Sequence, residues 1–219
     1  MASERRVLSI VGTGEWAWQS GRGAGYGWGM TGFDPYTLPA DLPVPIDDGR
    51  ARHLTGKRVP SVALITTMGD PVDLSKIPGR AVVFAYPRTG RPNVAPLTPD
   101  WDLVPGARGC TPHTCGYRDL AAEFVALDCR IFGLSTQEPA YQRELAERLH
   151  LPFPILSDSA LRLAAALGLP TLEIAGHVLL ARLSWVQRDA RIEHVFYPVF
   201  PPDKNAGEVL SWLRANPMR

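Results

Sequence analysis

The chain has 219 residues, 45% of them hydrophobic, which suffices for a buried core in one large domain or in one domain with an extension. A formal net charge of +1 gives no reason to expect nucleic acid or an anionic membrane as a partner. Three cysteines, an odd number, argue against a secreted disulfide framework, so we expect a reducing compartment and a cytoplasmic location.

Residues 1–39 are expected to form a poorly ordered extension rich in glycine and aromatic residues, and residues 40–219 the folded domain. The segment VLSIVGTGEWA at residues 7–17 is similar to a dinucleotide-binding fingerprint, which requires a helix after its glycines. Glycine occupies every second position from 21 to 29 and destabilises any helix there, so we reject a nucleotide site. Candidates for docking on the domain or on a partner are Trp16, Trp18 and Trp28.

The first part of the domain predicts strands. After a turn-rich lead-in, residues 61–67 form a short strand and residues 72–74 return antiparallel to it. Residues 81–86 (AVVFAY) are apolar without interruption, which is typical of a central strand covered on both faces.

The remaining elements alternate between helix and strand, which predicts an α/β fold of thioredoxin-like order, with a central mixed β-sheet flanked by helices. They are a helix over 109–127, a strand over 130–135, a helix over 136–149, a strand over 153–156, a helix over 159–167, strands over 177–187 and 192–196, and a helix from 203. Ser135 and Glu138 are expected to form a capping pair, with Pro139 in the first turn. Asp158 and Gly168 are expected to begin and end the helix over 159–167.

Two cysteines stand five positions apart in the segment PGARGCTPHTCGYRD, residues 105–119, where a helix is predicted to begin. Unpaired N–H groups and a partial positive charge at a helix N-terminus favour thiolate over thiol at Cys110. Arg108 and Arg118 are close in sequence and are expected to act in the same direction. The pattern therefore predicts a reactive thiol and a thiol redox enzyme.

Other interpretations of the cysteines fit the sequence less well. A zinc site with His113 lacks a second Cys-x-x-Cys pair or a distant histidine pair, and a thioredoxin-type dithiol needs two intervening residues where this chain has four. An inert core thiol suits Cys129 better, because it opens an apolar strand. No cofactor or metal is expected. The histidines expected on the surface or in turns are His113, His150, His177 and His194.

The segment GCTPHTCGYRD resembles the active-site segment of the Q-type, or bacterioferritin-comigratory, peroxiredoxins. The matching positions are Gly109, Cys110, Thr111, Cys115, Tyr117, Arg118 and Asp119. The resemblance extends from about residue 40 to the C-terminus and implies a thioredoxin-like fold. It also implies that Cys110 is the peroxidatic cysteine, which becomes a sulfenic acid, and that Cys115 resolves it to a disulfide. The implied partners are a peroxide and thioredoxin or a similar dithiol, and the chain would act as a monomer or homodimer.

The sequence departs from the family pattern at one position whose side chain usually takes part in the reaction. A threonine or serine usually stands three residues before the reactive cysteine, whereas this chain has Ala107, and residues 88–107 form a Pro-rich insertion after Pro87. Candidate replacements for the missing hydroxyl are Thr89, Thr111 and Thr114.

Arg182 lies in an apolar segment and is followed by Ser184 and Trp185. In the family that the chain resembles, a strand at this point carries an arginine followed by a hydroxyl residue and an aromatic residue. The resemblance implies that Arg182 contacts the reactive sulfur, where a fixed cation stabilises charge as the peroxide bond breaks. The alternative is an arginine on the solvent face of its strand.

The favoured function is thus a thiol-dependent peroxidase acting on hydrogen peroxide or organic hydroperoxides. One alternative is a thioredoxin-fold thiol–disulfide oxidoreductase or redox sensor with weak peroxidase activity, for which Ala107 would account. Another is a non-catalytic binding module that uses the aromatic N-terminal arm.

Overall fold

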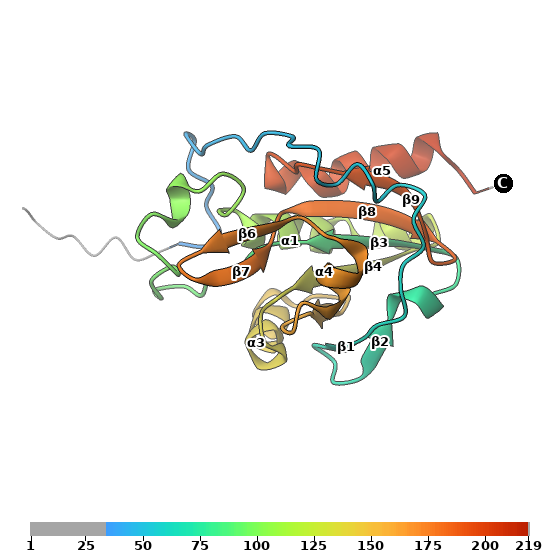
Figure 1. The fold of residues 1–219 in the computed structure, drawn as a ribbon, viewed down its shortest axis with the longest axis horizontal. Coiled ribbons are helices and arrows are strands. Elements are labelled where there is room, and N and C mark those ends of the chain that lie inside the picture. The colour runs from blue at the N-terminus through green and yellow to red at the C-terminus, as the bar shows by residue number, and fades with distance from the viewer. Residues whose placement is uncertain (1–33, 219) are drawn as a thin grey trace, which may run out of the picture. The chain divides into compact units, whose positions relative to one another are not determined.

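The computed structural model describes residues 34–218 (Figure 1). The extension predicted over residues 1–39 therefore lies almost entirely outside the described residues, and the boundary at residue 39 stays a prediction. Its last few residues are described and contact the domain: the side chain of Arg108 donates to the backbone carbonyl of Thr37 at 3.0 Å.

A seven-stranded mixed sheet forms the centre, in the order β2-β1-β5-β4-β3-β8-β9. Its strands are β1 (Ala63–Thr66), β2 (Pro71–Asp73), β3 (Arg80–Ala85), β4 (Cys129–Ser135), β5 (Ile155–Ser157), β8 (Leu183–Arg188) and β9 (Arg191–Phe196). β3 pairs in parallel with β4 and antiparallel with β8, and β2 returns antiparallel to β1 as predicted. The predicted central mixed sheet is confirmed.

The position of β3 follows from its composition, because all six of its residues are buried. Side chains alternate between the two faces of a strand. Ala81 and Val83 accordingly pack into the core on one face, whereas Val82 and Phe84 pack into the core on the other. Such a strand is stable only with both faces covered.

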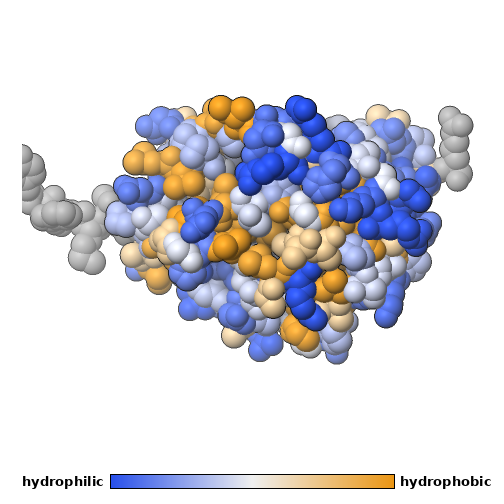
Figure 2. All heavy atoms as spheres, in the orientation of Figure 1, coloured by the Kyte–Doolittle hydropathy of each residue, from blue (hydrophilic) through white to orange (hydrophobic). Residues whose placement is uncertain are grey.

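Helices supply that cover: α1 (Cys110–Asp119), α2 (Ala121–Ala126), α3 (Pro139–Leu149), α4 (Arg162–Leu167) and α5 (Asn205–Ala215). Buried side chains of α1, α2, α3 and α5 join the core that contains Phe84, and those of α4 join the opposite core. None of the helices in residues 34–218 is long and apolar enough to span a membrane. Hydrophilic and hydrophobic residues are interspersed on the face shown in Figure 2.

Two predicted elements are divided. The helix predicted over 109–127 is interrupted at Leu120, which adopts φ −102° and ψ 9°, so that α1 and α2 are separate helices. The strand predicted over 177–187 is wrong as one element: β7 (His177–Leu180) ends before Ala181, and β8 begins at Leu183.

β7 pairs instead with β6 (Thr171–Ile174), a strand that the sequence analysis missed, in a two-stranded sheet of its own. The turn between them is Ala175-Gly176, and both residues have positive φ, 50° and 74°. A two-residue turn of this kind matches the twist of a hairpin, and glycine favours it. The Ala-Gly pair between two apolar runs was the available signal.

The starts of α3 and α4 test the predicted helix caps. The predicted pairing of Ser135 with Glu138 is wrong: Ser135 Oγ donates to the carbonyl of Pro87 at 3.2 Å, and Glu138 itself precedes α3 without a side-chain cap. Pro139 occupies the first turn of α3 as expected. α4 begins at Arg162, three residues later than predicted, and Leu161 precedes it without a side-chain cap. The carboxylate of Asp158 nevertheless accepts from the N–H groups of Leu163 and Ala164 in the first turn, at 3.2 and 2.8 Å.

Short 3₁₀ turns complete the chain: Leu74–Lys76, Trp101–Leu103 and Pro202–Lys204. The last of these leads into α5, so the final α-helix begins at Asn205, two residues after the predicted start.

Candidate active site

α1 begins at Cys110, and the residue before it sets the entry of the chain. Gly109 has φ +96°, a left-handed conformation that side chains other than glycine rarely adopt. A Cβ atom there would also lie 2.5 Å from a side-chain atom of Pro202. Glycine is therefore required twice over, and it places Cys110 at the first position of the helix, where backbone N–H groups are unpaired.

Arg182 meets the Cys110 sulfur. Its Nη2 lies 3.2 Å from Cys110 Sγ, and the thiol also lies 3.4 Å from the carbonyl oxygen of Ala107. Both Cys110 and Arg182 are only 3% exposed. The solvent-facing alternative for Arg182 therefore does not hold, and a buried cation contacts the sulfur.

The guanidinium is fixed by the loop that precedes the cysteine. Arg182 Nη2 also donates to the carbonyl oxygens of Gly106 and Ala107, both at 3.2 Å, and of Arg108 at 2.8 Å. Arg182 lies in the short link between β7 and β8, where the predicted strand is interrupted. The interruption thus directs this side chain toward α1.

His113 is the main error of the sequence analysis, which placed it on the surface. The ring is fully buried on α1, with Nε2 3.0 Å from Asn205 Oδ1 and Nδ1 3.3 Å from Arg182 Nη1. Burial and the charge of Arg182 lower its pKa from 6.5 to about 3. The ring is therefore neutral, accepts a hydrogen bond from Arg182 at Nδ1 and donates from Nε2 to Asn205.

Asn205, the first residue of α5, joins these groups into a network. Its Oδ1 also accepts from Tyr117 Oη at 2.8 Å and from Ser184 Oγ at 2.6 Å. Burial raises the pKa of Tyr117, so its hydroxyl remains a donor. The network ties α1, α5 and β8 together beneath the cysteine and holds the histidine that orients Arg182.

Acid should weaken the fold through His113. In the unfolded chain the ring takes up a proton as pH falls through its ordinary pKa of 6.5, whereas the folded ring does so only near 3. The unfolded state therefore binds more protons in this window, and the free energy of unfolding falls as pH drops, by about 1.4 kcal/mol per unit. Between pH 7 and pH 5 we expect His113→Gln to lose about 2 kcal/mol less stability than the wild type.

Urea denaturation of both proteins at the two pH values measures this difference. The matched control is His150→Gln, because His150 is exposed at the end of α3. An equal loss of stability in wild type and His113→Gln would show that the buried ring takes up its proton without unfolding.

Cys115 lies in α1, five residues after Cys110, but in a different environment. It is half-buried, and burial raises the pKa of its thiol, opposed by the charge of Arg118. Arg118 donates to Asp119 and to the carbonyl of Leu149. The structure therefore places Arg118 beside Cys115, not Cys110, and the expectation that it acts on the Cys110 thiolate is corrected.

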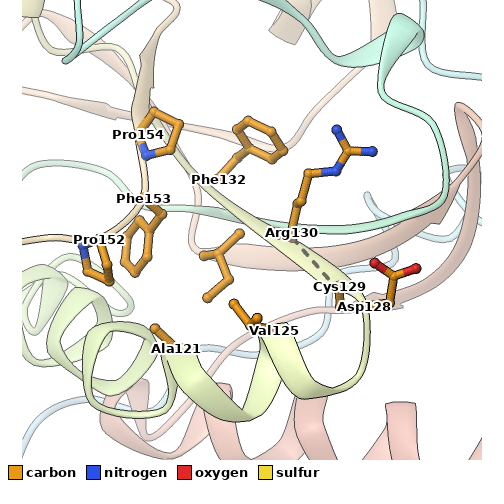
Figure 3. A pocket seen from close by; sticks show the side chains of 10 residues that line it. Ala121, Val125, Asp128, Cys129, Arg130, Phe132, Pro152, Phe153 and Pro154 are labelled. Carbon is orange, nitrogen blue, oxygen red and sulfur yellow. Dashed lines mark hydrogen bonds between the residues drawn. The ribbon is translucent and has the colours of Figure 1, made fainter.

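Cys129 is confirmed as a core residue. It opens β4, is buried, and burial raises its thiol pKa to about 12. It lies at an apolar pocket of about 430 Å³ whose lining includes Val125 and Phe153, and Figure 3 shows these side chains around the opening. Neither Cys110 nor Cys115 lines that pocket.

Comparison with known proteins identifies this arrangement. Residues 54–210 match the Redoxin family, which is more than half of the chain. The chain belongs to the Redoxin family, as a Q-type peroxiredoxin of the thioredoxin-like superfamily. It is accordingly a thiol-dependent peroxidase, with a peroxide substrate and a thiol reductant.

Individual relatives agree. Peroxiredoxin Q of Oryza sativa subsp. japonica is 28% identical over 184 residues, which cover 81% of this chain and 76% of the relative. The crystal structure of Peroxidoxin BcpB from Mycobacterium tuberculosis is 30% identical, with a TM-score of 0.60 over 75% of this chain and 98% of that one. Peroxiredoxin Q of Xanthomonas campestris, at 20% identity, shares the fold with a TM-score of 0.56 over 71% of this chain and 90% of its own.

The hydroxyl that this peroxiredoxin lacks at Ala107 is not supplied by two of the three threonines considered. Thr89 is buried and its Oγ1 donates to Gln137 Oε1 at 3.0 Å, and Thr114 Oγ1 donates to the carbonyl of Cys110 at 2.9 Å. Thr111 Oγ1 is buried without a hydrogen-bond partner among the described residues.

The insertion over residues 88–107 has a packing partner of its own. Trp101 and Ala107 form a small buried cluster with Ile174 of β6 and Leu179 of β7, and Figure 1 shows the hairpin beside the insertion. The insertion and the β6–β7 hairpin therefore stabilise each other, and Ala107 of this cluster also contacts the Cys110 thiol through its carbonyl oxygen. Within residues 34–218, no group of three or more His, Cys, Asp and Glu side chains is placed to hold a metal.

Proposed function

We propose that this peroxiredoxin reduces hydrogen peroxide or organic hydroperoxides through Cys110 as the attacking thiolate, Arg182 as its fixed cation and Cys115 as the resolving thiol. The observation that carries the proposal is the 3.2 Å contact between Arg182 Nη2 and Cys110 Sγ at the first residue of α1. A buried guanidinium and the unpaired N–H groups of a helix N-terminus both favour the anion.

The first half-reaction is a displacement at the terminal peroxide oxygen. Cys110 loses its proton to solvent, its thiolate attacks that oxygen, and an S–O bond forms as the O–O bond breaks. Sulfur is oxidised to sulfenic acid. The leaving oxygen is reduced and takes up a proton as water or an alcohol. Arg182, held by His113 and three carbonyls, stabilises the negative charge as it moves from sulfur to the leaving oxygen.

The other residues singled out by the sequence take supporting roles in this proposal. Gly109 gives the chain its entry into α1, and Pro87 follows β3 with its carbonyl bonded to Ser135. Thr111 adds a buried hydroxyl in the first turn. Arg118 acts in the second half-reaction, because it lies beside Cys115 and its charge favours the Cys115 thiolate.

In that second step Cys115 attacks the sulfenic acid, water leaves and a Cys110–Cys115 disulfide forms. An external dithiol then returns both sulfurs to thiols by exchange. We propose thioredoxin or a similar protein as this reductant, a monomer or homodimer as the active form, and the cytoplasm as the location, since three free thiols suit a reducing compartment.

Mass spectrometry after one equivalent of hydrogen peroxide tests the assignment. The wild type should lose two hydrogens and give a peptide linked between Cys110 and Cys115, with Cys129 unmodified. Cys115→Ser should stop at a sulfenic acid on Cys110 that a dimedone probe labels. Cys129→Ser is the matched control and should behave as the wild type does. Labelling of Cys115 first, or a linkage through Cys129, would overturn the proposed division of roles.

A further inference from the structure

We propose that Tyr86 supplies the hydrogen bond to the bound peroxide for which Ala107 has no group. This inference rests on the proposed role of Cys110 and adds a catalytic residue to it. Ala107 is fully buried and contributes only its backbone carbonyl to the sulfur and to Arg182. A donor for the peroxide must therefore come from another residue, and the two buried hydroxyls without a partner among the described residues are those of Tyr86 and Thr111.

Tyr86 directly follows β3 and precedes Pro87. Its N–H bonds to the carbonyl of Leu134 at 3.1 Å, so its backbone is fixed to the sheet. The ring is fully buried in the cluster that also contains Cys110. It packs on Phe84 with ring centroids 6.0 Å apart, and Phe84 in turn packs on His113 at 5.2 Å. The ring of Tyr86 thus lies in the core on the α1 side of the sheet, where Phe84 packs on both Tyr86 and His113.

Its hydroxyl has no hydrogen-bond partner among the described residues. An unpartnered hydroxyl in a buried position is costly for a fold, and buried polar groups are nearly always paired. Phenylalanine would fill the same space without that cost. The hydroxyl is therefore best explained by a partner that is present only during the reaction.

The group is also in the right protonation state for a donor. Burial and the nearby Cys110 raise the pKa of Tyr86 well above its ordinary value of 10, so the hydroxyl keeps its proton. Tyr86 and Cys110 also belong to the same buried cluster, so the phenol and the thiol share one apolar environment. A neutral O–H in the same buried cluster as the sulfur favours a nearby oxygen that gains negative charge. Tyr86 donates a hydrogen bond in this step and transfers no proton.

Single-turnover oxidation of Cys110 by hydrogen peroxide in Tyr86→Phe is the test. We expect the second-order rate constant to fall on the order of a hundredfold. The thermal unfolding midpoint should stay the same or rise, because an unpaired buried hydroxyl is removed. The matched control is Tyr141→Phe, whose hydroxyl already donates to the carbonyl of Thr89 at 3.1 Å. It should keep the wild-type rate and lower the unfolding midpoint.

Thr111→Val tests whether the other buried hydroxyl without a partner, that of Thr111, contributes to the rate. An unchanged rate in Tyr86→Phe, with or without a loss in Thr111→Val, would overturn the inference while leaving the role of Cys110 intact. A slower Tyr86→Phe with a lowered unfolding midpoint would also overturn it, since the hydroxyl would then be structural. If wild-type Cys110 is not oxidised at all, the proposed function itself fails.

Discussion

Arg182→Ala is expected to slow the oxidation of Cys110 by roughly a hundred- to a thousandfold, the usual effect of removing one buried donor that stabilises developing charge. The side chain contacts the sulfur and also holds three successive carbonyls of the loop before it. Its removal therefore withdraws the cation that contacts the sulfur and loosens the loop that positions the thiol.

Stopped-flow kinetics with hydrogen peroxide in large excess measures this rate. Arg182→Lys separates charge from geometry: lysine keeps the cation but cannot bond His113 and the carbonyls together. We expect it to recover no more than about a tenth of the wild-type rate. Arg188→Ala is the matched control, because Arg188 ends β8 and pairs with Glu193. A rate for Arg182→Ala within threefold of wild type would reduce Arg182 to a structural residue.

Features encoded within a few neighbouring residues could be predicted from the sequence. β3 is an example, since the uninterrupted apolar run over residues 81–86 is typical of a central strand, and the strand found there is buried throughout. Asp158 is another in part: its carboxylate accepts from N–H groups in the first turn of α4, but the helix begins three residues later than predicted. The reactive thiol followed from the cysteine pair at the start of a predicted helix, whereas the roles of Cys115 and Arg182 came from a family resemblance. The structure brings Arg182 to Cys110.

Features that depend on distant partners could not be predicted. His113 is buried because Asn205 and Arg182 satisfy its two ring nitrogens, and these residues lie 92 and 69 positions away in the sequence. His113 lies three residues after Cys110 and four before Tyr117, which places all three on one face of a helix. This spacing was the one local indication that the histidine faces the core. Tyr86 is similar, because only the fold shows that its hydroxyl lacks a partner.

The division of the helix predicted over residues 109–127 into α1 and α2 could not be predicted for a related reason. Local propensity predicts helix across residues 109–127, but Leu120 departs from helical geometry between α1 and α2. Tertiary packing overrides propensity at such points, since residues on both sides of the break join one core. The interruption matters for function, because it makes α1 a separate ten-residue helix that can open without α2.

Formation of the Cys110–Cys115 disulfide is expected to unwind the first turns of α1. Both cysteines lie on this one continuous helix in the reduced protein. Residues five apart on an α-helix are separated by roughly 7.5 Å along the axis and point about 140° apart. A disulfide requires Cα atoms within roughly 7 Å and side chains that face each other. The bond therefore cannot form while the helix is intact.

Unwinding must also release the contacts that the helix makes. Thr114 would lose its bond to the carbonyl of Cys110, and His113 would leave Asn205 and Arg182. Gly116 lowers the cost of opening in the helix interior. We expect amide hydrogens of residues 113–119 to exchange on the order of a hundredfold faster in the disulfide form, because they would then lie in a locally open segment.

Hydrogen exchange followed by mass spectrometry on the reduced and disulfide forms measures the change. Peroxide-treated Cys115→Ser is the matched control, because it carries the oxidised sulfur without the cross-link and should keep the protection of the reduced form. Amides of α3 should be unaffected, since that helix packs through Leu145 and Leu149 on the same core from a separate segment. Equal protection of α1 in both forms of the wild type would mean that Cys115 does not resolve Cys110, because the geometry leaves no other way to join them.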